Sequence, residues 1–444
     1  MQWAPHTEAD SQRVLQELGL KSIDDLFAHI PADVRVPGSL DLPDPLAEIE
    51  LTQLVDALAA KNRSSLICFA GGGIYDHYLP PVVRSLTMRP EFVTSYTPYQ
   101  PEVSQGVLQA LYEYQSMVSE LTGLAVANAS LYDGATAAVE ALNMAVAATK
   151  RNVAWVSAGL HPHTRQVLAT FAAARGIEIV EHPLVDGRTE WSAEAGTEPA
   201  AVMLAQPNYL GAIEDFDAAV SLAHDRGALA AVSVDPMTLG VLRTPGSAGA
   251  DIAFAEGQPL GNPMSFGGPV VGLFASTMDL VRRLPGRIVG RTNDADGRVA
   301  YAMTLRTREQ DIRREKASSN ICTNQTLNAI AAAVQLAWLG PKGLSDVGEH
   351  SIQKAHYLAS RLVELPGVHL LHEAPFAREF AVRLPMDPSQ AVLAMADRGF
   401  LAGIPLTEHY PDLGNGLLVA ATERRTKAEL DAYTDALKAV IADG

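Results

Sequence analysis

Two polar residues stand at the ends of neighbouring apolar runs in the middle of the chain. Asp235 follows the run 228–234, and Gln258 comes shortly after the run 252–255. An acid in the first position can hold a protonated ring nitrogen, and a lysine near the second can form a Schiff base with a carbonyl compound. Between Lys150 and Lys316, however, the sequence contains no lysine. The stretch has the layout of a covalent carbonyl site without its nucleophile.

This layout is typical of many enzymes that use pyridoxal phosphate (PLP). In them an acid at a strand end pairs with the pyridine nitrogen, and a lysine roughly twenty residues later holds the cofactor. Asp235 fits the acid, although Asp235-Pro236 could equally be a strand terminator, and Gln258 stands where we expect the lysine. We therefore predict a PLP-enzyme scaffold with a degenerate cofactor pocket, unable to hold the cofactor covalently by itself.

The turn that would cradle a phosphate lies at 129–136. Ser130 and Asp133 stand where a predicted strand gives way to a helix, and a helix N-terminus favours anions. Asp133 would repel a phosphate, and it is also a good helix N-cap. We predict a turn that keeps its shape without the cofactor. His161 and His163 could stack on a ring, or could belong to a plain loop.

Two segments further upstream concentrate polar and aromatic side chains. Gly71-Gly72-Gly73 precedes His77, and this glycine run either lets backbone approach a ligand or a neighbouring subunit, or forms a tight turn. His77 is either functional or a satisfied structural histidine. Tyr96, Tyr99 and Gln100 lie in a proline-stiffened stretch that resembles a ligand-facing wall, unless the tyrosines pack at an interface.

A third polar segment precedes a long predicted helix. Ser319, Asn320 and Thr323 could donate hydrogen bonds across a subunit interface. Lys316 lies in a charged run after the predicted sheet has ended, and we interpret it as solvated or salt-bridged.

Apolar runs alternate with helical patterns from residue 124 to residue 275, which indicates a mostly parallel sheet covered on both faces. The predicted strands are 124–128, 153–157, 177–180, 202–205, 229–234 and 252–255. A last strand is predicted at 270–274, and it could run antiparallel. The predicted helices between them lie near 133–149, 162–174 and 214–225. The fold class is therefore α/β, and the layout of Asp235 and Gln258 described above favours the PLP-dependent transferase type.

The sequence patterns at the two ends of the chain differ from the alternating pattern of its central part. Residues 1–65 carry helical patterns and predict an arm that wraps onto a partner subunit. The large domain would span 66–315. Residues 316–444 predict a bridging helix at 323–339 and a small α+β domain with helices near 344–364, 388–398 and 426–442.

Composition narrows the function classes. The chain has 444 residues, is 48% hydrophobic and carries a formal net charge of −17, which argues against nucleic acid and against an anionic membrane surface as partners. Cys68 and Cys322 show no metal-ligand spacing or disulfide framework. No apolar run is long enough to span a membrane, and residues 1–7 lack a secretion pattern, so we expect a cytoplasmic protein.

Four stretches together resemble one family. Residues 72–80, 96–106, 129–136 and 314–325 are similar to the glycine decarboxylase P-protein, in the form whose N-terminal-type half is a separate subunit. The resemblance covers essentially the whole chain. It implies that glycine is decarboxylated with PLP and that the aminomethyl group passes to the lipoyl arm of H-protein.

The resemblance also implies a division of labour. A second subunit of similar fold would supply the PLP lysine, in an α2β2 assembly with the active site at the subunit interface. This chain would contribute interface residues rather than a complete catalytic set; the candidates are Tyr96, Tyr99, Gln100, His77, Ser319, Asn320 and Thr323. The degenerate pocket would contain Ser130, Asp133, His161, Asp235 and Gln258.

Two rival interpretations remain open at this point. A complete PLP enzyme, such as an aminotransferase or a cysteine desulfurase, needs a Schiff-base lysine at a strand end, and none is available. A non-catalytic pseudoenzyme or scaffold has no need of the polar wall at Tyr96, Tyr99 and Gln100.

Overall fold

The chain forms two compact units, Met1–Ser64 and Ser65–Gly444, in a computed structural model that describes residues 5–36, 38, 40–192 and 198–443. Residues 1–4, on which the absence of a secretion pattern partly rests, lie outside the described residues. The first unit contains helices α1 (Glu8–Glu17) and α2 (Glu48–Ala59) and two short 3-10 turns, Ile23–Phe27 and Ala32–Val34. Thr7 and Asp10 form the capping box that starts α1, as their spacing predicts.

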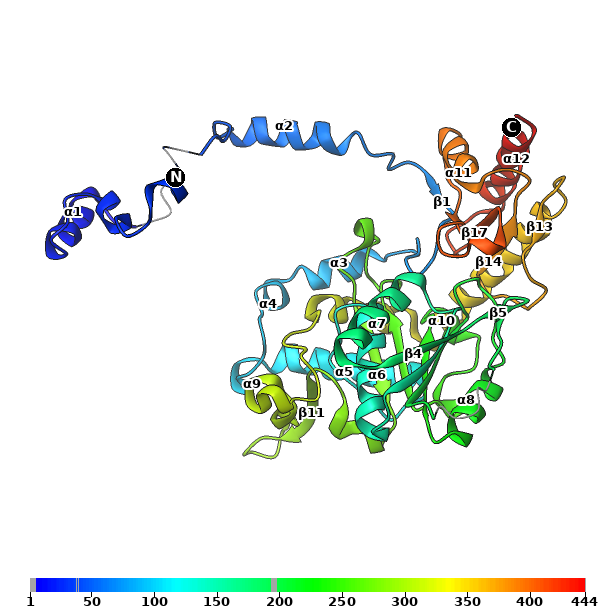
Figure 1. The fold of residues 1–444 in the computed structure, drawn as a ribbon, viewed down its shortest axis with the longest axis horizontal. Coiled ribbons are helices and arrows are strands. Elements are labelled where there is room, and N and C mark those ends of the chain that lie inside the picture. Colours follow the sequence, from blue (N-terminus) through cyan, green and yellow to red (C-terminus); the bar gives the residue numbers. More distant parts are fainter. Residues whose placement is uncertain (1–4, 37, 39, 193–197, 444) are drawn as a thin grey trace. The chain divides into compact units, whose positions relative to one another are not determined.

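A seven-stranded sheet forms the centre of the second unit (Figure 1). Its order is β2-β10-β9-β8-β7-β3-β4, and β9, β8, β7, β3 and β4 run parallel. The strands are β2 (Val126–Ala127), β3 (Val153–Ser157), β4 (Glu178–His182), β7 (Ala201–Gln206), β8 (Leu229–Val234), β9 (Ile252–Glu256) and β10 (Gly272–Ser276). β10 is antiparallel to both neighbours. The predicted α/β class with a mostly parallel sheet is confirmed.

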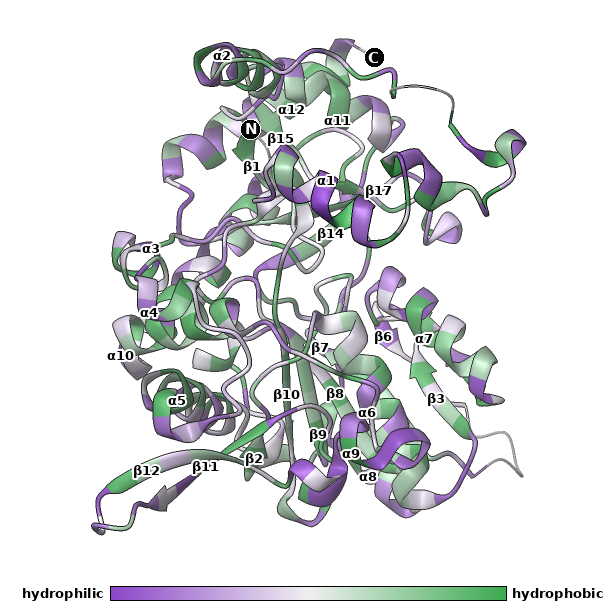
Figure 2. Cartoon of the chain, turned by 90° about the vertical axis from the view of Figure 1, so that its left-hand side faces the viewer, coloured by the Kyte–Doolittle hydropathy of each residue, from purple (hydrophilic) through white to green (hydrophobic). Residues whose placement is uncertain are grey.

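Helices cover both faces of this sheet, which is why its central strands β7, β8 and β9 are mostly apolar, whereas the edge strand β4 carries Glu178, Glu181 and His182 (Figure 2). Val202 and Leu204 of β7 join one core cluster with α5, and Met203 between them joins another with α6 and α7. This is the alternation that a pleated strand imposes on successive side chains. The covering helices are α5 (Gln105–Thr122), α6 (Gly134–Thr149), α7 (Pro162–Arg175) and α8 (Phe216–Asp225).

A β-hairpin beyond β10 has no counterpart among the sequence-based predictions. Strands β11 (Ile288–Asn293) and β12 (Val299–Thr304) pair antiparallel and pack on α5 (Figure 1). Gln115 of α5 fixes the hairpin, because its side chain bonds both the N–H and the carbonyl of Val289. Short helices follow at Arg306–Arg308, α9 (Gln310–Arg313) and Arg314–Lys316, and α3 (Pro81–Thr87) and α4 (Pro90–Val93) precede α5.

The C-terminal part begins with α10 (Thr326–Leu362), which is interrupted at Gly340 and Pro341. Two predicted helices are thus one broken helix. A four-stranded antiparallel sheet follows, in the order β13 (His369–Leu370), β14 (Glu379–Arg383), β17 (Gly416–Ala420) and β16 (Ile404–Pro405). α11 (Pro388–Asp397) and α12 (Lys427–Asp443) accompany it.

Strand β1 (Ile67–Cys68) connects the start of the second unit to its C-terminal part, because it pairs parallel with β15 (Phe400–Leu401). The predicted boundary at residue 315 stays a prediction. A small hairpin of β5 (Leu184–Val185) and β6 (Arg188–Thr189) completes the strands. No helix in the described part of the chain has the length and apolar character that a membrane span requires.

Candidate functional site

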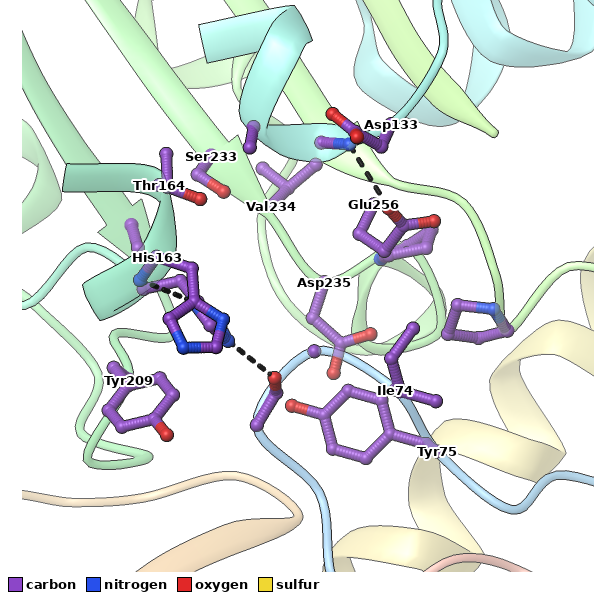
Figure 3. A pocket seen from close by; sticks show the side chains of 18 of the residues that line it. Ile74, Tyr75, Asp133, His163, Thr164, Tyr209, Ser233, Val234, Asp235 and Glu256 are labelled. Atoms are coloured by element: carbon purple, nitrogen blue, oxygen red, sulfur yellow. Dashed lines mark hydrogen bonds between the residues drawn. The ribbon is translucent and has the colours of Figure 1, made fainter. Parts of the chain in front are cut away.

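A pocket of about 260 Å³ opens at the carboxyl ends of β7, β8 and β9 (Figure 3). This is the edge of a parallel sheet at which ligands of α/β proteins bind. The N-termini of α6 and α7 reach the pocket, and so does the segment 71–78 that follows β1, which we call the strap. Asp133, His161 and Asp235, three of the residues predicted for a degenerate cofactor pocket, lie in its lining.

The N-terminus of α6 is occupied by carboxylates of this chain. Asp133 is the N-cap, and its Oδ1 accepts the Thr136 N–H at 2.7 Å. Glu256, at the end of β9, accepts the Gly134 N–H at 3.0 Å and the Gln258 N–H at 2.9 Å (Figure 3). Burial raises the pKa of Glu256 to about 7. The place where an anionic phosphate would sit at a helix N-terminus is thus filled by a side-chain carboxyl.

Gln258 lies behind the pocket and holds the strap. It is buried, its Oε1 accepts the Tyr75 N–H at 2.9 Å, and its Nε2 donates to the Asn262 carbonyl at 2.8 Å. The amide at the expected lysine position therefore has a structural role.

Asp235 forms an ion pair within the chain. Its Oδ2 accepts from Nε of Arg378 at 2.5 Å, and Arg378 is 2% exposed. The Arg378 guanidinium lies 3.6 Å above the centre of the Tyr75 ring. The acid that would pair with a pyridine nitrogen in a PLP enzyme is paired here with an arginine from β14's N-terminal side.

His77 lies in the same buried network. Its Nδ1 donates to Glu423 at 2.5 Å, and its Nε2 accepts from Arg378. Burial, and then the charge of Arg378, lower the pKa of His77, so the ring is neutral. Both ring nitrogens are engaged inside this chain, whereas the sequence interpretation placed His77 among candidates for a shared interface.

The glycine run of the strap brings backbone close to buried side chains. Glu379 accepts the Gly72 N–H at 2.7 Å and the Tyr75 hydroxyl at 2.9 Å, and His161 donates from Nε2 to the Gly72 carbonyl at 2.8 Å. A Cβ on Gly71 would lie 2.1 Å from Oε1 of Glu379, so only glycine allows this approach. Burial, and then His163, lower the pKa of His161 to about 4.

A second group of predicted residues gathers away from the pocket, around Arg287. Arg287 donates to the Tyr99 hydroxyl at 3.3 Å, to the Thr323 hydroxyl at 3.4 Å and to the Cys322 carbonyl at 2.5 Å. Ser130 belongs to this group and not to the pocket lining, because its hydroxyl accepts from Asn324 at 2.9 Å.

The remaining interface candidates surround this group on the chain. Tyr96 and Gln100 are exposed in the segment of Tyr99, and Tyr96 is 82% exposed. Asn320 is exposed, and Ser319 is half-buried with its hydroxyl accepting the Ile321 N–H.

The pocket of this chain does not fit PLP. None of the described residues that line it is a lysine, a phosphate would meet the carboxyls of Asp133 and Glu256, and Asp235 is bound to Arg378. Three requirements of the cofactor, a Schiff-base partner, an anion site and a pyridine partner, are each unmet.

Comparison with known proteins identifies the family of this chain. Residues 1–437 match the family model of the glycine cleavage system P-protein. The chain belongs to the glycine cleavage system P-protein family. It is 48% identical to the probable glycine dehydrogenase (decarboxylating) subunit 1 of Moorella thermoacetica over 445 residues, with 100% of both chains covered. It is 49% identical to the protein of the same name from Chlorobium chlorochromatii, covering 98% of this chain and 99% of that one.

Solved structures agree with this P-protein assignment. The crystal structure of a glycine decarboxylase P-protein in inhibitor-bound form superposes with a TM-score of 0.91 at 47% identity, covering 99% of this chain and 100% of that one. A sphingosine-1-phosphate lyase from Burkholderia pseudomallei superposes with a TM-score of 0.66 at 14% identity, over 93% of this chain and 94% of that one. The second likeness concerns the fold alone.

Sequence reasoning missed the charged partners that define both groups. Glu256 directly follows a predicted strand, so the sequence could have placed it at the edge of the sheet, beside the site. Arg378, Glu379 and Arg287 carried no such signal, because each meets its partners only through tertiary contacts.

Proposed function

We propose that this chain is the lysine-free subunit of a two-subunit glycine-decarboxylating enzyme of the glycine cleavage system. The observation that carries the proposal is the pocket: full-length similarity to P-protein subunits comes with a sheet-edge site whose anion and pyridine positions are filled by Glu256 and Arg378. A chain of this kind needs a partner to supply the cofactor-binding lysine.

PLP, held by that partner, supplies the electron sink that stabilises charge when glycine loses CO2. The part of this chain is to complete the shared site from its own surface. Tyr96, Tyr99 and Gln100 on one segment and Ser319, Asn320 and Thr323 on another are the proposed contributions. Tyrosine and amide side chains in such positions orient substrate and exclude water.

The acceptor of the aminomethyl group is the lipoyl arm of H-protein in this proposal, and the assembly is an α2β2 heterotetramer in the cytoplasm. The name "subunit 1" carried by the relatives supports the existence of a partner. A pseudoenzyme without a part in the reaction is the alternative, and no observation favours it.

The test is an absorbance scan of the purified chain with PLP, alone and after addition of the partner subunit. A lysine-bound cofactor absorbs in the visible range. We expect no visible band from this chain alone, and a band together with glycine-dependent CO2 exchange from the mixture. A borohydride-reducible band at a specific lysine of this chain would revive the complete PLP enzyme. A band without CO2 exchange would favour the scaffold.

A further inference from the structure

Arg287 is a buried arginine that forms no ion pair among the described residues. The nearby carboxyl of Glu309, whose pKa is raised by burial, also feels the positive charge of Arg287 but does not bond it. Three arginines are buried among the described residues, namely Arg287, Arg378 and Arg425, at 6%, 2% and 4% exposure. Arg378 pairs with Asp235, and Arg425 pairs with Asp76 at 3.1 Å. No carboxylate of the described residues lies within ion-pair distance of Arg287, and its Nε has no hydrogen-bond partner there.

Such an arrangement is costly unless an anion completes it. A buried charge is normally paired, because removal from water is expensive and only a close opposite charge offsets that cost. The neutral groups around Arg287 supply one short bond, from the Cys322 carbonyl at 2.5 Å, and three contacts of 3.3–3.4 Å, from the Tyr99 hydroxyl, the Thr323 hydroxyl and Oδ1 of Asn324. Most N–H donors of the guanidinium group therefore make only long hydrogen bonds or none to the described residues.

A second arginine shares the same tyrosine. The guanidinium carbon of Arg306 lies 4.7 Å from the centre of the Tyr99 ring, and that of Arg287 lies 5.5 Å from it. Arg306 has only distant acids, Glu309 at 3.8 Å and Asp311 at 3.9 Å, and its Nε also lacks a hydrogen-bond partner in the described chain. Two cations therefore flank one half-exposed aromatic ring.

The segment that contains Arg306 has an excess of positive residues, on a chain that is strongly negative overall. Residues 306–316 contain five arginines and lysines against three acids, whereas the whole chain carries −17. Arg313, Arg314 and Lys316 are exposed and form no ion pair among the described residues. A locally positive surface concentrates anions near it.

We propose that Arg287, Arg306 and Tyr99 form an oxyanion-binding site, which takes a phosphate or a carboxylate group. Guanidinium groups bind both anions through paired N–H donors, and the hydroxyls of Tyr99 and Thr323 add neutral donors. In the assembled enzyme the oxyanion is either the phosphate of the partner's cofactor or the carboxylate of glycine, and this choice of source rests on the proposed function. The binding site itself does not.

The first experiment uses the full chain without its partner. Inorganic phosphate and acetate are titrated separately, with sodium chloride at matched ionic strength as the reference, and the thermal unfolding midpoint is measured. We expect one or both anions to raise the midpoint beyond the chloride reference, and Arg306→Gln to weaken this binding about tenfold or more, the effect of one lost charge-assisted contact. Arg306→Lys, which keeps the charge and loses the planar donors, should recover only part of it.

Matched controls separate this site from general charge effects. Arg298→Gln removes one positive charge from the tip of the neighbouring hairpin, where Arg298 is exposed and pairs with Asp296, and should bind as wild type. Arg287→Gln is informative if it folds, but Arg306 carries the test because its side chain is 38% exposed and tolerates truncation. Equal anion effects in wild type and Arg306→Gln, or none beyond chloride in wild type, would overturn the proposal.

The second experiment uses the assembled complex and identifies the source. If Arg306→Gln has a larger dissociation constant for PLP, measured by visible absorbance, and an unchanged KM for glycine, the oxyanion is the phosphate of the cofactor. A raised KM with unchanged PLP binding supports the substrate carboxylate. If wild-type complex shows no glycine-dependent activity, the proposed function fails while the anion titration of the single chain still decides the oxyanion site.

Discussion

Glu379 is buried and Glu256 is half-buried at the pocket, and burial raises the pKa of each carboxyl to about 7. In the unfolded chain such groups titrate at their ordinary value of 4.5. The folded state therefore holds these protons more tightly. The stability that each group contributes is fully present at low pH, and it falls as the pH rises from about 4.5 to about 7.

We expect Glu256→Gln to remove its share of this pH dependence, because an amide does not titrate while its oxygen still accepts the Gly134 N–H. The free energy of unfolding is measured with urea at about pH 5 and about pH 7.5. Between these two pH values, the wild type should lose roughly 1–3 kcal/mol more of this free energy than the variant does. Glu120→Gln, an exposed change near the end of α5, is the matched control. If the free energy of unfolding changes with pH in the same way in the wild type and in Glu256→Gln, the predicted titration of Glu256 is contradicted.

Asp235 has become a structural partner of Arg378. We expect Asp235→Asn to lower the free energy of unfolding by about 3 kcal/mol, because it leaves a buried guanidinium without its carboxylate. Asp217→Asn breaks the exposed pair with Arg243, and should cost at most about 1 kcal/mol. Urea unfolding of both variants measures the difference, and equal losses would mean that the buried pair is not special.

At the scale of elements, α1 and α2 bury none of their residues. Helices of 10 and 12 residues are marginal in water on their own, so their stability depends on packing of an apolar face. Leu51, Leu54 and Leu58 of α2 offer such a face at helical spacing and are exposed. This supports the interpretation of residues 1–65 as an arm for a partner subunit.

Deletion of residues 1–64 should therefore leave the second unit folded and weaken its assembly. The second unit has its own core clusters, so its thermal midpoint by circular dichroism should stay near that of the full chain. Loss of several buried apolar side chains should weaken binding of the partner subunit roughly a hundredfold or more, measured by titration of one subunit with the other. Unchanged affinity would remove the arm from the interface.

At the scale of the whole molecule, the relatives carry the name subunit 1, and the proposal takes the partner to be a separate polypeptide. We expect an equimolar mixture of the two subunits to give one species containing two copies of each. Light scattering after size-exclusion chromatography measures its mass. A stable complex of one copy each with full glycine-dependent activity would contradict the α2β2 arrangement.

Local sequence patterns predict most strands of the central sheet. Strands β3 and β8 begin and end where the predicted runs 153–157 and 229–234 do, because apolar character throughout a short run is what burial on both sheet faces demands. The hairpin β11–β12 was missed because half of its residues are exposed and it is held by Gln105 and Gln115 of α5 rather than by its own pattern.

The sequence by itself determined that no lysine stands between residues 150 and 316, that an α/β sheet forms there, and that Asp133 caps a helix. These are properties of residue type and of short-range spacing. Only the tertiary structure decided what replaces the cofactor's contacts. Arg378 reaches Asp235 across 143 residues and Glu256 reaches Gly134 across 122, so these pairs exist only once the tertiary fold has brought the start of β14 to the end of β8 and the start of α6 to the end of β9. The same holds for Arg287, whose neighbours Tyr99 and the segment 322–324 are distant from it in the sequence.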